Sequence, residues 1–258
     1  MASATRLFVE QDLNAGAVVG ASADQAHYLR SVLRMKGGEP VLLFNGRDGE
    51  WSARIDGLGK GWASLKVLEK RRDQTASPDL WLLFAPIKRA RHDFLIQKAT
   101  ELGCARISPV LTRRTQVERV KDERLRANAI EAAEQCERLE APQVDAPRKL
   151  QDWLDAWPAD RRLLVAAESG DAPPLAEALA AEPDPDRPRW ALLIGPEGGF
   201  AQDELESLRQ LAFVTPVGLG PRVLRAETAA LAAIAVWQSA AGDWGSRPPG
   251  RNGGSGAE

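Results

Sequence analysis

Two short glycine-rich turns near the carboxyl end of the chain hold the residues with the clearest chemical potential. The first spans residues 195–200, with the sequence GPEGGF, and the second spans residues 217–220, with the sequence VGLG; Arg225 and Glu227 follow. Because glycine has no side chain, such turns leave backbone amide and carbonyl groups open to a bound molecule. An arginine beside them can stabilise developing negative charge, and a carboxylate can accept a proton. The pattern predicts a ligand site with groups suited to proton transfer.

Neither turn has the pattern of a phosphate-binding loop. The sequence contains no G-x-G-x-x-G and no G-x-x-x-x-G-K-[ST] motif. Pro196 and Glu197 stand where a pyrophosphate would need free amides and no negative charge. A neutral or cationic ligand therefore fits the turns better than a dinucleotide. A second interpretation, that both are ordinary tight turns without a ligand, stays open at this point.

Other reaction classes find little support in the sequence. The two histidines, His27 and His92, have no cysteine or histidine at ligand spacing, and Cys104 and Cys136 lie in unlike contexts. We therefore expect no metal, no disulfide and no nucleophile triad, which argues against a hydrolase or metalloenzyme and favours a cytoplasmic protein. No apolar run approaches the roughly 18 residues of a membrane-spanning helix, so we expect no membrane partner.

Buried parallel strands must position the two turns. Residues 190–194 form an apolar run that predicts a strand, and residues 201–210 predict a helix. Ligands of open parallel sheets bind outside the carboxyl ends of the strands, so two such ends predict a crevice. The last helix, expected over residues 227–241, is rich in alanine and must pack very closely.

The remaining patterns divide the chain into two parts. Residues 5–68 predict a small, mostly β barrel, and from residue 80 strands and helices alternate, which predicts a parallel α/β sheet. The expected barrel strands cover residues 5–9, 40–45, 50–58 and 62–68, with a helix over residues 24–35. The expected later strands cover residues 80–86, 107–111, 163–167 and 191–194, and the helices cover residues 94–102, 124–139, 150–157 and 174–181.

The charge of the chain is distributed unevenly. Its net charge is −2, but residues 1–130 carry 22 Lys and Arg against 15 Asp and Glu, whereas residues 131–258 carry 12 against 21. Basic clusters lie at residues 71–72, 88–91 and 113–114. The basic residues of the first half can contact the phosphates of a nucleic acid, although each cluster alone can also be a solvated surface.

Five motifs in a fixed order extend over residues 6–241. They are HYL with VLRMKGGE at residues 27–29 and 32–39, KRAR with IQKATELG at 88–91 and 96–103, EAAEQC at 131–136, GPEGGF at 195–200, and LGPRVLRAETA at 219–229. Together they resemble the ribosomal RNA small subunit methyltransferase E (RsmE) family, which belongs to the SPOUT methyltransferases. The resemblance covers nearly the whole chain except its tail.

This resemblance implies a fold and an activity. It implies a PUA-like RNA-binding β-barrel over residues 1–72, a linker over 73–79, a SPOUT methyltransferase domain over 80–242 with a parallel sheet and a trefoil knot, and a disordered tail over 243–258. The implied activity is S-adenosylmethionine-dependent methylation of uridine N3 in small-subunit (16S) ribosomal RNA. The implied substrate is the assembled 30S subunit, and the implied oligomer is a homodimer.

The resemblance also implies roles for individual residues. Arg225 and Glu227 are the expected catalytic residues, Arg225 by stabilising the uridine as its N3 proton leaves and Glu227 as a proton acceptor, with Glu197 as an alternative acceptor. Both glutamates also have non-catalytic interpretations, a helix cap for Glu227 and a backbone-amide clamp for Glu197. The expected cofactor-binding residues are Leu193, Gly195, Pro196, Glu197, Gly198, Gly199, Leu219, Gly220, Leu224 and Thr228. The expected RNA-binding residues are His27, Arg30, Arg34, Lys88, Arg91, Lys98, Arg113, Arg114, Gln135 and Arg138.

Some of these RNA candidates have a second interpretation. Lys98 and Glu101 are spaced to pair on one helix face, and Gln135 with Arg138 can instead lie at a subunit interface. Four positions also depart from the family pattern: Tyr28 replaces a common histidine, Asp93 a glutamate, Arg113 an acidic residue and Glu137 a glycine. These departures affect the expected RNA contacts more than the expected reaction.

Two functions from other classes stay open on sequence alone. One is a non-catalytic RNA-binding or ribosome-assembly factor, which failure to bind S-adenosylmethionine would favour. The other is an α/β enzyme with a nucleotide cofactor such as NAD, against which the missing glycine fingerprint already counts. Thermal shifts with each cofactor distinguish them.

Overall fold

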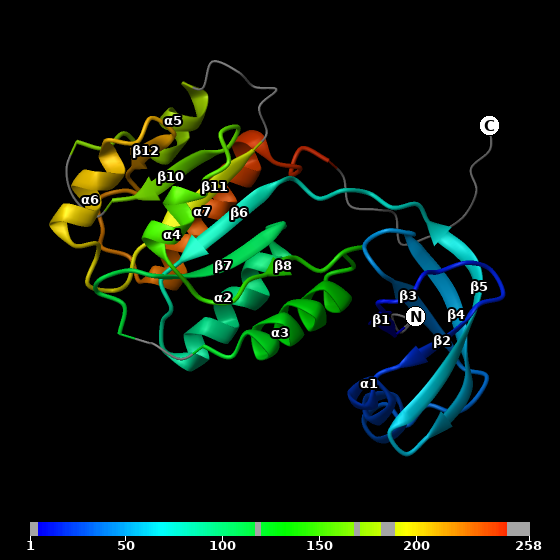
Figure 1. Cartoon of the computed structure of the whole chain (residues 1–258). Helices are drawn as coiled ribbons and strands as arrows, with labels where there is room; N and C mark the ends of the chain where they lie inside the picture. Colours follow the sequence, from blue (N-terminus) through cyan, green and yellow to red (C-terminus); the bar gives the residue numbers. More distant parts are fainter. Residues whose placement is uncertain (1–4, 117–119, 168–170, 182–188, 247–258) are drawn as a thin grey trace, which may run out of the picture.

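The structure is a computed structural model that describes residues 5–116, 120–167, 171–181 and 189–246. It contains a five-stranded and a seven-stranded sheet, which lie at opposite ends of an elongated molecule (Figure 1). We call the part built on the first sheet the N-terminal unit and the part built on the second sheet the C-terminal unit. Every helix within the described ranges is too short or too polar to cross a lipid bilayer.

The N-terminal unit is a curved, mainly antiparallel sheet. Its strand order is β1-β3-β4-β5-β2, and only β1 and β3 pair in parallel. Alternate residues point inward, so that Leu7, Val41, Ile55 and Leu65 form its core with neighbours from every strand. The strands are β1 Arg6–Phe8, β2 Val18–Ala21, β3 Pro40–Phe44, β4 Glu50–Gly59 and β5 Trp62–Arg72.

One helix of this unit differs from its prediction. Helix α1, Ala23–His27, begins with a capping box in which Ser22 and Gln25 bond each other's backbone amides. The chain then continues as a π-helical turn, η1, over Tyr28–Val32, and it reaches a left-handed conformation at Arg34, where φ is 58°. The helix predicted over residues 24–35 was therefore too long. Strand β2 was missed because Val18–Ala21 contains a glycine and only four residues.

The C-terminal unit is an α/β sheet with the order β12-β10-β11-β6-β7-β8, in which β9 also pairs with β7. Every pairing is parallel, as the alternating pattern predicted. Its strands are β6 Leu80–Phe84, β7 Arg106–Leu111, β8 Gln143–Val144, β9 Arg148–Lys149, β10 Arg162–Ala166, β11 Trp190–Ile194 and β12 Val214–Val217. Its helices are α2 Arg89–Glu101, α3 Asp122–Gln135, α4 Leu150–Asp155, α5 Leu175–Ala180, α6 Gln202–Arg209 and α7 Ala226–Ala241.

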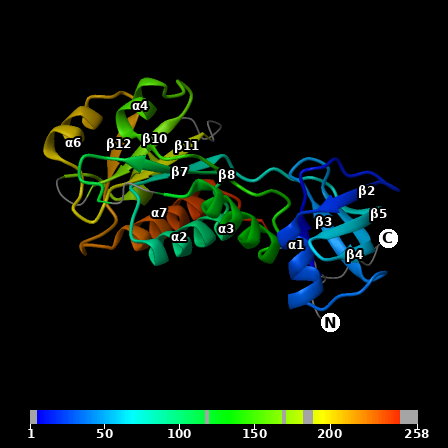
Figure 2. The ribbon, with the colours of Figure 1, turned by 60° about the horizontal axis from the view of Figure 1, so that its bottom comes forward.

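Helices cover both faces of the seven-stranded sheet. Side chains of α2, α3, α5 and α7 share one hydrophobic cluster, whereas those of α4 and α6 belong to another. Figure 2 shows α2, α3 and α7 together on one side of the sheet and α4 and α6 on the other. The predicted α/β class with a parallel sheet after a small β unit is therefore correct. The trefoil knot stays a prediction, and most of the predicted disordered tail lies outside the described residues.

The alanine-rich helix α7 packs as closely as its composition predicted. Ala230, Ala233 and Ile234 are 0–1% exposed and contribute to the core beneath the sheet. At its far end Gln238 donates a hydrogen bond of 2.6 Å to the carbonyl of Leu102. A Cβ atom on Gly103, whose φ is +91°, would lie 2.5 Å from the Gln238 amide nitrogen. Gly103 therefore ends α2 and makes room for α7.

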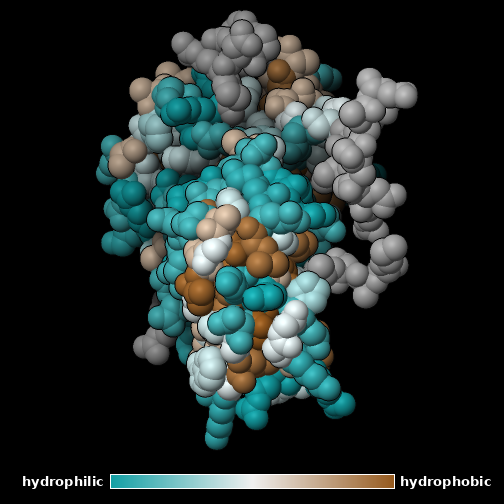
Figure 3. All heavy atoms as spheres, turned by 90° about the vertical axis from the view of Figure 1, so that its right-hand side faces the viewer, coloured by the Kyte–Doolittle hydropathy of each residue, from teal (hydrophilic) through white to brown (hydrophobic). Residues whose placement is uncertain are grey.

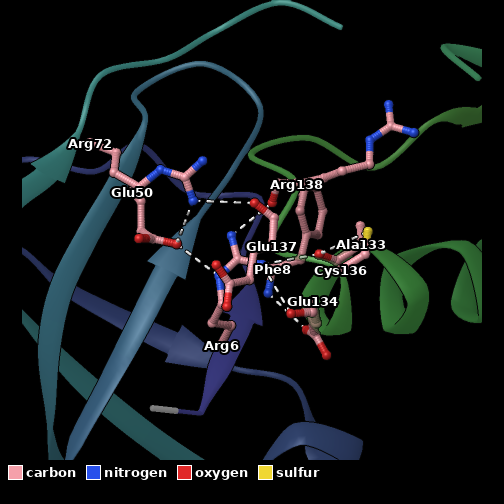
Figure 4. A network of polar contacts seen from close by, with 9 residues as sticks. All are labelled: Arg6, Phe8, Glu50, Arg72, Ala133, Glu134, Cys136, Glu137 and Arg138. Atoms are coloured by element: carbon pink, nitrogen blue, oxygen red, sulfur yellow. Dashed lines mark hydrogen bonds and ion pairs between the residues drawn. The ribbon is translucent and has the colours of Figure 1, made fainter. Parts of the chain in front are cut away.

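A buried arginine joins the two units. The Arg6 side chain, on β1, is 4% exposed and pairs with Glu50 of β4 at 2.7 Å (Figure 4). Its guanidinium also donates to the backbone carbonyls of Ala133, Glu134 and Arg138, at and beyond the end of α3. The charge is thus satisfied by both units at once, which a buried guanidinium requires.

Two further contacts strengthen this junction. The Phe8 amide donates to the Glu134 carboxyl group at 2.8 Å, and Arg72 donates to the Glu137 carbonyl at 3.3 Å. Glu137 has a left-handed backbone with φ of 64°. This conformation explains why a glycine suits the position, and it places the departure of Glu137 at the junction.

Substitution of Glu137 by glycine should stabilise the protein by about 1 kcal/mol, because the left-handed conformation is strained for a residue with a Cβ atom. Chemical denaturation would measure this change. Glu131→Gly, at an exposed position within α3, is the matched control and should destabilise by about 1 kcal/mol. Destabilisation by both substitutions would contradict the strain at Glu137.

The stability of the junction should depend on pH through Glu134. Burial raises the pKa of its carboxyl group from 4.5 to about 7, against the lowering effects of the Phe8 hydrogen bond and the Arg6 charge; Glu131 raises it further. The folded state therefore holds the proton where the unfolded state has lost it. This contribution to stability, about 3 kcal/mol, is complete below pH 4.5 and is lost as the pH rises through 7.

Glu134→Gln should flatten this dependence, because an amide oxygen still accepts the Phe8 hydrogen bond but carries no charge. Denaturant titrations between pH 5 and 8 would compare it with Glu123→Gln, an exposed change on the same helix at a residue that does not perturb Glu134. An equal slope in wild type and Glu134→Gln would show that Glu134 does not bind the proton.

Candidate functional site

Three neighbouring strand ends define the candidate site. In the sheet, β10 lies between β11 and β12, and all three run in parallel. The first glycine-rich turn follows β11 and the second follows β12, so both turns flank the end of β10 at Ala166 and Ala167. The predicted crevice at adjacent strand ends is therefore present.

A cavity of about 460 Å³ lies at this edge of the sheet. This volume is within the range of about 300–1,000 Å³ for small-molecule sites. Its lining combines backbone from both turns with small or apolar side chains and a few polar groups. The lining residues are Arg114, Ala166, Ala167, Ile194, Gly195, Pro196, Gly198, Gly199, Phe200, Gln202, Leu205, Arg209, Leu219, Gly220, Arg222, Val223, Leu224, Ala226 and Ala229.

The first turn is held tightly by its own backbone. The Gly199 amide donates to the Pro196 carbonyl at 2.8 Å, and Gly199 has a left-handed φ of 65°. A Cβ atom on Gly195 would approach the Phe200 ring to 3.0 Å. The conformation thus favours glycine at Gly199, whereas a side chain at Gly195 would require the Phe200 ring to move.

The second turn is anchored to the segment before α5. The Gly218 amide donates to the Pro173 carbonyl at 2.8 Å, and the Gly218 carbonyl accepts from the Leu175 amide at 3.0 Å. Gly220, with φ of +96°, then turns the chain toward α7. The strand end, the turn and the helix start are consequently fixed together.

The two expected catalytic residues lie where α7 begins. Arg225 is the N-cap residue and is exposed, and its side chain makes no capping bond. Glu227 lies in the first helical turn, where the helix dipole favours a negative charge. Its side chain is 12% exposed; one oxygen lies 3.4 Å from Nε of Arg91, and the other has no hydrogen-bond partner among the residues that the structure describes. Arg225, not Glu227, therefore occupies the N-cap position.

The expected cofactor residues separate into two groups. Gly195, Pro196, Gly198, Gly199, Leu219, Gly220 and Leu224 line the cavity together. Leu193 is fully buried in the core beneath it, Glu197 is exposed, and Thr228 is exposed on α7. The cavity lining does not include these three side chains.

Two of the expected RNA-binding arginines, both exposed, follow β7 and contact the first turn or α6. Arg114 lines the cavity and donates to the Gly198 carbonyl at 2.8 Å. Arg113 pairs with Asp203, and its backbone amide donates to Glu204 at 2.8 Å. The departure at Arg113 thus connects β7 to α6.

Other expected RNA contacts are engaged within the protein. Arg138 donates to the carbonyls of Thr100 and Cys104 and to Ser77, so its guanidinium ties the segment after α3 to the end of α2 and to the residues before β6. Lys98 pairs with Glu101, as its alternative interpretation predicted. Arg91 faces Glu227 and, at 3.9 Å, Glu197.

The remaining expected contacts are exposed. His27, Arg30 and Arg34 lie on α1, η1 and the residues after them, Lys88 precedes α2, and Gln135 ends α3. The departure Tyr28 is 42% exposed beside them. The departure Asp93 instead pairs with Arg124 and accepts from Asn128, which ties α2 to α3.

Sequence reasoning missed the part of the cavity that comes from β10 and α6. Ala166 and Ala167 lie at the end of β10, whose neighbours in the sheet come from later in the chain, and no local pattern reveals that order. Gln202 and Arg209 lie on an amphipathic helix whose polar residues look like an ordinary solvated face. The one sequence signal for the α6 residues was that α6 directly follows the first turn in the chain.

Within the described part of the chain, no group of three or more His, Cys, Asp or Glu residues is placed to hold a metal ion. His92 is 4% exposed and contacts the Phe84 ring edge-on. Burial lowers its pKa to about 4, so the imidazole is neutral near pH 7 and belongs to the core.

Comparisons with known proteins bear directly on this arrangement. An RNA methyltransferase domain model matches residues 75–238, and an RNA methyltransferase PUA domain model matches residues 22–68. The ribosomal RNA small subunit methyltransferase E of Rickettsia conorii is 34% identical over 231 residues, 89% of this chain and 93% of its own. The chain belongs to this methyltransferase E family.

A second relative and a solved structure agree with this membership. The methyltransferase E of a Synechocystis strain is 35% identical over 90% of this chain and 76% of its own length. The crystal structure of the Neisseria gonorrhoeae enzyme, bound to S-adenosyl methionine, superposes with a TM-score of 0.82 at 30% identity, covering 93% of this chain and 99% of that one. The resemblance to the methyltransferase E family is therefore confirmed, and with it the fold class of a SPOUT-type α/β unit preceded by a PUA-like unit.

Arg91 should stabilise the start of α7 in this methyltransferase E chain. Arg91→Met would leave Glu227 without its partner in a largely buried place, and should lower the free energy of unfolding by about 1 kcal/mol. The double variant Arg91→Met/Glu227→Gln should recover part of that loss in denaturant titrations. Lys88→Met, an exposed change just before α2, is the control and should stay within about 0.5 kcal/mol of wild type.

Proposed function

We propose that this protein transfers a methyl group from S-adenosylmethionine to N3 of a uridine in small-subunit (16S) ribosomal RNA, and that it acts on the assembled 30S subunit. One observation carries the proposal. A cavity of 460 Å³ lies at three parallel strand ends, with Arg225 and Glu227 at the helix start beside it. Membership of the methyltransferase E family supports the same activity.

The residues of the cavity fit S-adenosylmethionine. The cofactor has no pyrophosphate, which agrees with turns that offer backbone groups but not a phosphate loop. Leu219, Leu224 and Phe200 supply apolar surface for an adenine ring, and the backbone of Gly195, Gly198 and Gly199 supplies hydrogen-bonding groups without side chains in the way. Leu193 would act through its backbone, and Glu197 and Thr228 would contact the ligand only at the rim.

When bound, S-adenosylmethionine supplies an electrophilic methyl group on its sulfonium centre. The protein must hold the uridine in line with that group and allow the N3 proton to leave. Arg225 is exposed at the amino end of α7. Its guanidinium can donate a charged hydrogen bond to a uracil carbonyl oxygen as negative charge develops there. Glu227 and Glu197, both near Arg91, are the two carboxylates that can accept the proton.

The RNA contacts, the oligomeric state and the domain bounds follow from the same proposed function. Exposed His27, Arg30, Arg34, Lys88 and Gln135 would contact the RNA, whereas Arg138 and Lys98 would keep their bonds to other groups of the protein. We propose a cytoplasmic homodimer in which a partner subunit completes the cofactor site. We also propose units at residues 1–72 and 80–242, joined by 73–79 and followed by a tail over 243–258.

The reaction itself can be tested with undermethylated small subunits. The protein and isotopically labelled S-adenosylmethionine would be added, and the nucleosides of the RNA analysed by mass spectrometry. Labelled 3-methyluridine is the expected product. Label at another nucleoside would refute the target atom, and cofactor binding without any label would favour an assembly factor. Naked RNA serves as a parallel substrate, and light scattering reports the oligomer.

Gly199→Arg should abolish binding of S-adenosylmethionine while leaving the fold largely intact. Arginine is strained at φ of 65°, and its side chain would enter the cavity. Isothermal titration calorimetry would measure the affinity. Gly16→Arg, at a left-handed position in the N-terminal unit with open space around it, controls for backbone strain alone. Unchanged affinity in Gly199→Arg would show that S-adenosylmethionine does not bind in this cavity.

Arg225→Ala should slow methyl transfer by about 100-fold or more and change cofactor affinity only a few-fold, because the group acts on charge that develops during the reaction. Single-turnover rates and calorimetry would separate the two effects. Arg189→Ala, an exposed arginine just before β11 and so at the opposite ends of the strands from the cavity, is the matched control. A loss of cofactor affinity as large as the loss of rate would make Arg225 a cofactor ligand.

A further inference from the structure

The N-terminal unit presents one exposed indole in an unusual setting. Trp62 begins β5, directly after the two-residue turn Lys60–Gly61, and it is 55% exposed. Figure 3 looks onto this end of the molecule, where hydrophobic side chains gather among hydrophilic ones.

Two glycines hold this indole in place. Trp62 pairs with Gly59 across the hairpin, and a Cβ atom on Gly59 would collide with the indole nitrogen. A Cβ atom on Gly57 would lie 2.8 Å from Cζ3 of the same ring. The indole therefore lies directly on the backbone of β4, in a fixed orientation, and presents its remaining surface to solvent. A pre-positioned aromatic face of this kind can stack on a planar ligand.

Two unpaired cations lie on the same face of the sheet. Arg54 of β4 stands directly opposite Lys66 of β5. Their neighbours Ala53, Ile55, Leu65 and Val67 are 0–1% exposed on the inner face, so Arg54, Lys66 and Trp62 all point outward. Like charges directly opposite one another destabilise a sheet. In the described part of the chain neither cation forms an ion pair with a carboxylate, so a bound anion would relieve the repulsion.

We propose that this outer face binds single-stranded RNA, with a nucleobase stacked on Trp62 and a phosphate held between Arg54 and Lys66. The inference rests on the proposed function, which it extends to a second contact surface away from His27, Arg30 and Arg34. Trp62 and Lys66 are four residues apart, or about 13 Å along the strand, so the site takes a short segment of several nucleotides. The combination of an aromatic platform with adjacent cations matches the chemistry of an unpaired RNA strand better than that of an apolar protein surface.

Fluorescence anisotropy of the full chain with a labelled single-stranded RNA of about 12 nucleotides tests this surface. Trp62→Ala should weaken binding by about 5- to 100-fold, whereas Trp62→Phe should retain most of the affinity because a ring remains. Trp244→Ala removes an equally exposed tryptophan, at 51%, from the other end of the chain and should leave the affinity unchanged. Equal affinity of wild type and Trp62→Ala would overturn the proposal.

Two cation variants test the phosphate contact separately. Arg54→Gln and Lys66→Gln should each weaken binding and lower the slope of log affinity against log salt by about 1. These variants and Trp62→Phe keep the experiment decisive if Trp62→Ala does not fold. An unchanged salt slope in both would overturn the phosphate contact.

The assay needs neither cofactor nor methyl transfer, so its outcome is independent of the proposed reaction. If no 3-methyluridine forms but Trp62→Ala still weakens RNA binding, the reaction fails and the surface stands. If Trp62→Ala binds the oligonucleotide normally yet methylates assembled subunits more slowly, the surface contacts a protein and the RNA proposal is wrong. Calorimetry with S-adenosylmethionine should give wild-type affinity for every variant of this face.

Discussion

The burial of one guanidinium, that of Arg6, determines how the two units of the molecule are joined. An arginine at 4% side-chain exposure cannot remain uncompensated, since its charge has lost most of its hydration. Glu50 supplies one acceptor from the N-terminal sheet, and three backbone carbonyls around the end of α3 supply the others. The carboxyl end of a helix already carries partial negative charge, so α3 is a natural place for this cation. Without the C-terminal unit, Arg6 would lose its three carbonyl acceptors and keep Glu50 as its partner.

This junction determines where the surfaces of the N-terminal unit lie relative to the cavity. Arg72 adds a bond that crosses the same boundary, and its acceptor, the Glu137 carbonyl, is again a backbone group. Because carbonyl acceptors are fixed by the fold, the geometry depends little on side-chain flexibility. A substrate that touched both the hairpin of β4 and β5 and the loop before α7 would meet a largely rigid surface.

The sequence allowed the architecture and half of the site to be predicted, for identifiable reasons. Regular periodicity and glycine boundaries located the main strands and helices, and the motifs identified the family. The two turns were recognisable because Gly199 and Gly220 adopt left-handed backbone conformations, which favour glycine locally. Contacts that depend on strand order, such as Ala166 beside both turns, had no local signal. The same holds for Arg138, whose basic character suggested RNA but whose partners are carbonyls far away in the chain.

The strand order determines when the walls of the cavity form during folding. Its walls come from β10, from the turn after β11 and from the segment between β12 and α7, and Arg114 closes one side. Since β12 is the last strand in the chain yet pairs with β10, the cavity has no complete wall until residues 214–229 have docked. During synthesis the N-terminal unit and most of the sheet can be assembled earlier, as domains generally fold in the order in which they emerge. The capacity to bind a small molecule is therefore acquired only when the last-synthesised residues have docked, and a shorter chain would lack both this wall of the cavity and the core contacts of α7.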